Sequence, residues 1–149
     1  MEQEVKILFR EYSDVLDEFV VETLWATPID SENRKYRIEN VPFYVQTAFL
    51  NIVIAEFDND EGFLVFKENV SESGNSTIQV VMLNSEISID NIRNILEAKG
   101  CESEKLNDKF FVLDVPANAN YTAILKKLDQ LAEQQIIDYG ELYLSENHN

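Results

Sequence analysis

A single cysteine and a single histidine limit the chemistry that this chain of 149 residues can perform. Lone Cys101 excludes an internal disulfide, and a zinc site needs more thiol and imidazole ligands than two residues supply. A catalytic Cys–His pair is not favoured, because His148 falls in the terminal "SENHN", which we expect to be a flexible tail over residues 146–149. The sequence therefore predicts a protein that is not an enzyme, with no metal and no cofactor.

Basic residues are scarce. Twelve Lys and Arg stand against twenty-eight Asp and Glu, which gives a formal net charge of −16. Such a surface repels nucleic acid and anionic lipid, so neither is expected as a partner. It suits a basic protein partner reached by electrostatic steering. A plain solvated surface is the alternative, since net charge bears on association and not on fold.

Long apolar runs are missing as well. No run reaches the length of a transmembrane helix. The N-terminal "MEQEVKILFREY" carries acids where a secretion signal has a basic region followed by an apolar one. We therefore expect a cytoplasmic protein. Its hydrophobic content of 45% is enough to form a core.

Residues 1–75 are predicted to be β-rich. Alternating apolar residues favour strands in "VKILFREY", "EFVVETLWA", "KYRIENV" and "FLVFKENV", and the run "AFLNIVIAEF" fits either a buried strand or a short helix. Trp25, Phe43 and Phe49 are expected in the core. These strands either form a small barrel or extend the sheet of the second half.

In residues 76–145 the apolar period changes from two to 3.6, which predicts helices over 89–99 and 121–133. Strands before, between and after them give the order β-α-β-β-α-β. That order is typical of a ferredoxin-like unit, with both helices on one face of an antiparallel sheet. The predicted fold class is α+β, a β-rich half and a ferredoxin-like half packed as one compact unit.

Several segments resemble a bacterial family of domains of unknown function, number four-two-six-five. They are "LWATPID", "YRIENVPFYV", "SGNSTIQVV", "GCESE", "VLDVPANANYTAIL" and "DYGELYL", spread over about residues 20–144. The family usually shows Ser-Gly-His-Ser-Thr, a hydrophobic residue and Arg, but here Asn75 stands in place of that His and Gln79 in place of that Arg. The resemblance implies a fold and a bacterial origin. It implies no activity, and any function that those two residues have in relatives is weakened or lost here.

The stretch "SESGNSTIQVV" raises the question of a phosphate loop. Such a loop needs further glycines, a Lys, and a helix whose N-terminal amides face the anion. Gly74 is followed by no Lys, and the segment after it is strand-like. Because Gly and Asn tolerate a positive φ, we predict a turn without a catalytic role at 73–77.

Two groups of carboxylates lie at predicted strand connections. The loop "DNDEG" is not an EF-hand, because Phe63 occupies the sixth position, where that loop needs Gly. Both groups are expected to be exposed, and one of them to face a basic partner. The predicted partner-binding residues are Asp14, Asp17, Glu18, Asp58, Asp60 and Glu61.

Two functions remain open. The first is a protein-binding module, an immunity or inhibitor protein that covers the basic active-site face of a cognate bacterial toxin with carboxylates. The second is a small-molecule sensor or regulatory module, which rests on the analogy with other ferredoxin-like units. In either case we expect a monomer or a weak homodimer.

Overall fold

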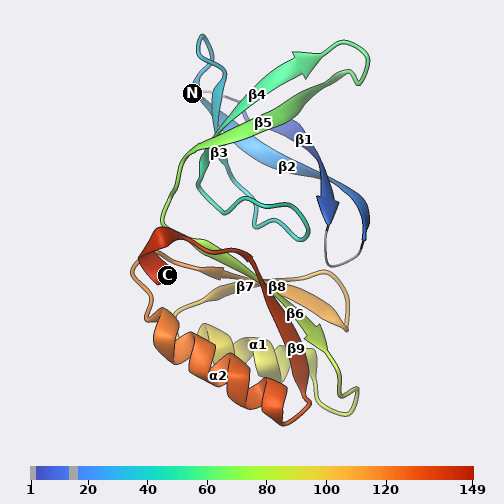
Figure 1. Cartoon of the computed structure of the whole chain (residues 1–149), viewed down its shortest axis with the longest axis vertical. Coiled ribbons are helices and arrows are strands. Elements are labelled where there is room, and N and C mark those ends of the chain that lie inside the picture. Colours follow the sequence, from blue (N-terminus) through green and yellow to red (C-terminus); the bar gives the residue numbers. More distant parts are fainter. Residues whose placement is uncertain (1–2, 14–16) are drawn as a thin grey trace. The chain divides into compact units, whose positions relative to one another are not determined.

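The structure of the chain is a computed structural model, which describes residues 3–13 and 17–149. Strands, two helices and largely antiparallel pairing confirm the α+β class (Figure 1). The chain divides into two compact units, Met1–Ser73 and Gly74–Asn149. Within the described ranges, no helix has both the length and the apolar character needed to cross a membrane.

The first unit is a closed barrel, so the barrel alternative is the correct one. Successive strands pair antiparallel, and β1 and β5 pair in parallel to close the ring. The run "AFLNIVIAEF" contributes a strand and no helix. The strands are β1 (Val5–Ser13), β2 (Glu18–Asp30), β3 (Lys35–Ile38), β4 (Ile52–Asp58) and β5 (Phe63–Ser71).

Alternation along the strands builds the barrel core. Ile7 and Phe9 of β1 face inward with Leu24 and Ala26 of β2, and all four are buried. Trp25 lies between the last two and therefore points outward, with 43% of its surface exposed. The expectation that Trp25 belongs to the core is wrong, because the inner face of β2 is the one that carries Leu24 and Ala26.

The inner face of β2 also carries Glu22, whose carboxylate is paired with backbone N–H groups. It accepts hydrogen bonds from the three backbone N–H groups of residues 43–45, at 2.8, 3.0 and 3.3 Å. Glu11 accepts a fourth from the N–H of Gln46, at 2.8 Å. Burial raises the pKa of Glu22, against the opposing effect of these N–H groups. Two inward carboxylates thus hold the segment after β3 over one end of the barrel.

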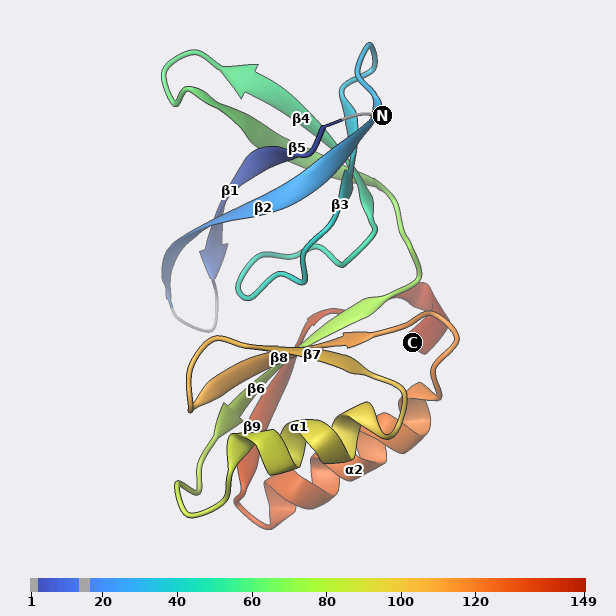
Figure 2. The same ribbon diagram turned by 180° about the vertical axis from the view of Figure 1, so that it is seen from behind.

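The second unit has the predicted element order, and both predicted helices are confirmed. The four strands are arranged β7-β8-β6-β9, and every neighbouring pair is antiparallel. Both helices cover the same face of this sheet (Figures 1 and 2). The elements are β6 (Ser76–Met82), α1 (Ile89–Glu97), β7 (Glu102–Lys105), β8 (Phe110–Val115), α2 (Tyr121–Glu133), β9 (Ile137–Tyr143) and the 3-10 turn η1 (Glu146–His148).

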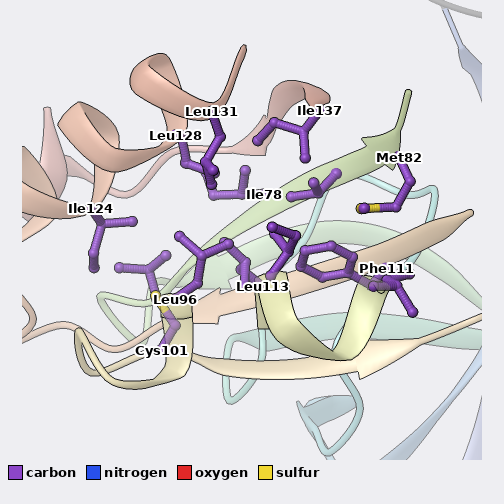
Figure 3. Close-up of a cluster of buried hydrophobic side chains, with 14 of the residues drawn as sticks. Ile78, Met82, Leu96, Cys101, Phe111, Leu113, Ile124, Leu128, Leu131 and Ile137 are labelled. Atoms are coloured by element: carbon purple, nitrogen blue, oxygen red, sulfur yellow. The ribbon is translucent and has the colours of Figure 1, made fainter. Parts of the chain in front are cut away.

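The core of the second unit lies between these helices and the sheet (Figure 3). Leu96 of α1 and Leu128 of α2 are fully buried there against Ile78 and Leu113 of the central strands. Ser88 caps α1, because its side chain accepts a hydrogen bond from a backbone N–H of the first turn.

Candidate functional site

Where the sequence predicts a turn over 73–77, the chain bends at Gly74 and enters β6 at Ser76. This glycine has a φ of 95°, a conformation that L-residues rarely adopt. A Cβ atom at this position would lie 2.7 Å from the Cβ of Ala117. The glycine is therefore required by a bend and by the close approach of another segment, which explains its presence without a phosphate.

Asn75 is buried beside Asp114. Its Nδ2 donates to both carboxylate oxygens of Asp114, at 3.0 and 3.3 Å, and its Oδ1 accepts from the N–H of Ala117 at 3.2 Å. Burial raises the pKa of Asp114 to about 6, and the charge of Glu102 adds to the rise. A carboxyl with such a pKa is suited to proton transfer, but here an amide occupies both of its oxygens.

The expectation of a flexible tail at residues 146–149 is wrong. His148 is only 8% exposed, since its Nδ1 lies 2.6 Å from the hydroxyl of Ser76 and its Nε2 lies 2.9 Å from the carbonyl of Pro116. The carbonyl can only accept, so Nε2 carries the proton, and in the neutral ring the Ser76 hydroxyl donates to Nδ1. Ser76 in turn accepts from the N–H of Ser145 at 2.8 Å.

This Ser–His pair is not a catalytic arrangement. Ser76 has no exposed surface, so no substrate reaches its hydroxyl, and the second ring nitrogen of His148 binds a neutral carbonyl and not a carboxylate. The Ser76–His148 pair instead holds the end of the chain against β6. Cys101 is also unsuited to nucleophilic attack, because burial raises its thiol pKa to about 12. Among the described residues, no group of three or more His, Cys, Asp or Glu is placed to hold a metal ion.

The most unusual surface of the first unit is the outer face of the β1–β2 hairpin. Four large apolar side chains lie on this face with exposed fractions of 48, 70, 56 and 43%: Tyr12, Phe19, Val21 and Trp25. We call these four residues the hairpin patch. The Tyr12 and Phe19 rings meet edge to face at 5.4 Å, and Lys6 lies 5.0 Å above the Trp25 ring.

Two of the predicted carboxylates, Asp17 and Glu18, lie at the margin of this patch. Asp17 accepts a hydrogen bond from the hydroxyl of Tyr12, and exposed Glu18 directly precedes Phe19. Asp14 falls outside the described residues. From the other group, Glu61 accepts from the Nη2 of Arg10 at 2.9 Å.

Arg10 stands opposite Val21 in the β1–β2 pair, so the structure brings members of both groups beside the hairpin patch. The remaining two residues differ from each other. Asp60 is exposed as expected, whereas Asp58 is only partly exposed, because its carboxylate accepts from the N–H groups of Asp60 and Glu61 within the β4–β5 turn.

The sequence pattern singled out the carboxylates and gave no indication of the hairpin patch. The signal that identifies it is that β2 is apolar on both faces, whereas a barrel strand with one solvated face normally alternates apolar and polar residues. Glu22 obscured this signal, since a carboxylate at position 22 suggests that its own face is the solvated one.

Comparison with known proteins supports the fold and adds no activity. The family described as "Domain of unknown function (DUF4265)" matches residues 22–139. A solved structure described as "Novel crystal structure of a hypothetical protein from Neisseria gonorrhoeae" superimposes with a TM-score of 0.82 at 20% sequence identity. The match covers 97% of this chain and 98% of that one, and at this identity it shows a shared fold alone. Among curated proteins, no sequence matched.

Proposed function

The chain belongs to the DUF4265 family, and we propose that it is a non-enzymatic protein-binding module that inhibits a basic protein, as immunity proteins inhibit bacterial toxins. The hairpin patch is the observation that carries this proposal. Single exposed apolar residues are normal on a protein, but several large ones gathered on one face of a hairpin, with a polar margin, are typical of an interaction site. Aromatic side chains and arginine dominate the binding energy of such sites, and the patch offers Tyr12, Phe19 and Trp25 beside Arg10.

Charge supports a basic partner. Residues 1–73 contain sixteen Asp and Glu against six Lys and Arg, a formal net charge of −10. The field of such a unit raises the rate at which a basic protein arrives, and the carboxylates at the margin, Asp17 and Glu18, orient it over the apolar centre. A toxin that acts on nucleic acid has the complementary charge, since it must attract phosphates.

The ferredoxin-like assignment of the second unit is part of the same proposal. The order β-α-β-β-α-β, the strand arrangement β7-β8-β6-β9 and the two helices on one face all favour it. In this proposal the second unit is a folded support, and the first unit carries the interface.

The test is co-expression of the chain with the product of the adjacent gene. We expect the chain to restore growth that this product inhibits, and the two proteins to form a complex whose association slows as salt rises. Phe19→Ala should speed dissociation by about tenfold, which corresponds to the loss of a moderate hot spot. Leu106→Ala is the matched control, because Leu106 is also exposed but belongs to the second unit.

Charge reversal tests the margin separately. Glu18→Lys should slow association and weaken its salt dependence. Asp60→Lys, which changes an exposed residue in the turn between β4 and β5, should change the association rate little. A complex that dissociates equally fast with Phe19→Ala and Leu106→Ala, and associates at a rate insensitive to salt and to Glu18→Lys, contradicts the proposal.

A further inference from the structure

The end of the barrel away from the segment 43–46 contains a hollow of about 360 Å³. The two ends are distinguished along β2, where Glu22 holds the segment 43–46 and Pro28, further along the strand, pairs with Tyr36. The hollow falls in the size range of small-ligand sites, which often occupy the mouths of β-barrels. It is lined by Arg34, Tyr36, Ala55, Glu56, Phe57 and Leu64.

Tyr36 gives this hollow a polar floor. The residue points into the barrel core and is only 9% exposed. Its hydroxyl makes no hydrogen bond to any group in the described part of the chain, yet no fully buried side-chain oxygen or nitrogen there lacks a partner. The hydroxyl must therefore reach solvent, and the hollow that the residue lines provides the opening. A ligand that enters without offering a partner would leave this hydroxyl unpaired, which is unfavourable.

The rim of the hollow carries both signs of charge. The Nη1 of Arg34 lies 3.2 Å from the Oε2 of Glu56, an ion pair that leaves N–H donors of the guanidinium for a further acceptor. Because both side chains are about half exposed, their mutual attraction is weak and does not prevent either from binding a ligand. The backbone fixes Arg34 in place, since its carbonyl accepts from the N–H of Ala55 at 3.1 Å and its φ is 61°.

Apolar walls lie between this rim and the floor. Ala55 is buried and Leu64 partly buried, and Phe57 stands at the edge with 62% of its surface exposed. A flat ring fits such walls better than a branched chain, because it can stack against the Phe57 ring.

We propose that this hollow binds a free aromatic α-amino acid whose ring carries a hydroxyl, as the ring of tyrosine does. The carboxylate of the ligand binds Arg34, its ammonium binds Glu56, its ring lies against Phe57, and its hydroxyl pairs with that of Tyr36. The charge separation within the ligand matches that of the rim, and both of its polar ends meet a partner. This site does not depend on the hairpin patch, so it is independent of the proposed inhibitor function.

The test is a titration of the ¹⁵N-labelled chain with L-tyrosine, up to its solubility limit, and with L-phenylalanine. Saturable amide shifts should be confined to residues around the hollow, with tyrosine bound about tenfold more tightly than phenylalanine. Tyr36→Phe removes the hydroxyl alone, and it should abolish this preference while leaving phenylalanine binding unchanged. No saturable shift with tyrosine overturns the proposal, as does a preference that survives Tyr36→Phe.

The rim is tested with matched arginine variants. Arg34→Gln should weaken tyrosine binding about tenfold. Arg37→Gln, in β3 directly after the turn that carries Arg34 and paired with Glu39, should have less than about a twofold effect. Tyramine, which lacks the carboxylate, should bind the wild-type chain as weakly as tyrosine binds Arg34→Gln. Equal effects of the two variants, or equal affinity for tyramine and tyrosine, contradict the assigned role of Arg34. Phe19→Ala should leave tyrosine binding intact, which separates this site from the protein interface.

Discussion

Replacing Glu22 with glutamine should destabilise the first unit although the side chain keeps its shape. The carboxylate uses both oxygens: Oε2 accepts from the N–H of Phe43, and Oε1 accepts from those of Tyr44 and Val45. An amide has one acceptor. The orientation that keeps two of the three bonds places the NH₂ group against the N–H of Phe43, where two donors face each other.

The magnitude follows from two opposing effects. A lost hydrogen bond to a charged acceptor is worth about 1.5–3 kcal/mol, and a donor left without a partner adds to that cost. The neutral amide is easier to bury than the carboxylate, whose pKa burial has raised, and this offsets part of the loss. We expect Glu22→Gln to lower the free energy of unfolding of the first unit by about 1–3 kcal/mol.

Urea unfolding followed by tryptophan fluorescence measures this change, because Trp25 is the sole tryptophan and lies in the first unit. Glu18→Gln is the control, since it makes the same substitution at an exposed position of the same strand and should stay within about 0.5 kcal/mol of the wild type. Hydrogen exchange of the Phe43 amide should accelerate more than that of Tyr44. Equal midpoints for the two variants, with unchanged exchange at Phe43, would refute the reasoning.

Three further predictions concern the second unit, whose helices make far-UV circular dichroism a specific probe of its unfolding. Gly74→Ala should lower the free energy of unfolding of the second unit by about 2–4 kcal/mol, because a φ of 95° and contact with Ala117 both oppose a Cβ atom. A variant as stable as the wild type would contradict this. The pKa of Asp114 is about 6 in the fold, against 3.8 in the unfolded chain. Protonation of Asp114 therefore stabilises the fold by about 3 kcal/mol, fully below about pH 3.8, and this contribution is lost as the pH rises to about 6. Asp114→Asn should therefore flatten the dependence of stability on pH over that interval, and an unchanged slope would show that another group titrates. Ser76→Ala removes the hydroxyl that binds His148 and should lower the free energy of unfolding by about 1–3 kcal/mol. Its affinity for the partner should stay within a factor of a few, and a larger loss would place this network in the interface.

The helices were predictable from the sequence because their determinants are local. The 3.6-residue period over 89–99 and 121–133 identifies both helices, and Ser88 marks the start of the first. The position of His148 was not predictable in this way, because its partner Ser76 lies 72 residues away in the sequence. A short polar segment at a chain end has the composition of a flexible tail whether or not such a partner exists.

Strand β2 shows why the predicted face of a barrel strand can be inverted. Its two faces are both rich in apolar residues, so hydrophobicity does not distinguish them, and Glu22 favours the wrong choice. Three backbone N–H groups of residues 43–45 require an acceptor at the end of the barrel, and this requirement exists only once β3 and the segment after it are in place. The orientation of β2 is therefore decided by a carboxylate and distant amides, and not by the apolar pattern.

The same orientation places Phe19, Val21 and Trp25 in solvent, although inverting the strand would bury them. Inversion would also expose Leu24 and Ala26 and leave the amides of 43–45 without acceptors, which is more costly than three exposed apolar side chains. Stability thus explains why these positions face outward, but it does not explain why they are apolar. A threonine at position 19 or 21 would keep the strand propensity without exposing a large apolar surface. Because the fold does not require large apolar residues at both positions, their exposure supports the proposal that the hairpin patch is an interface.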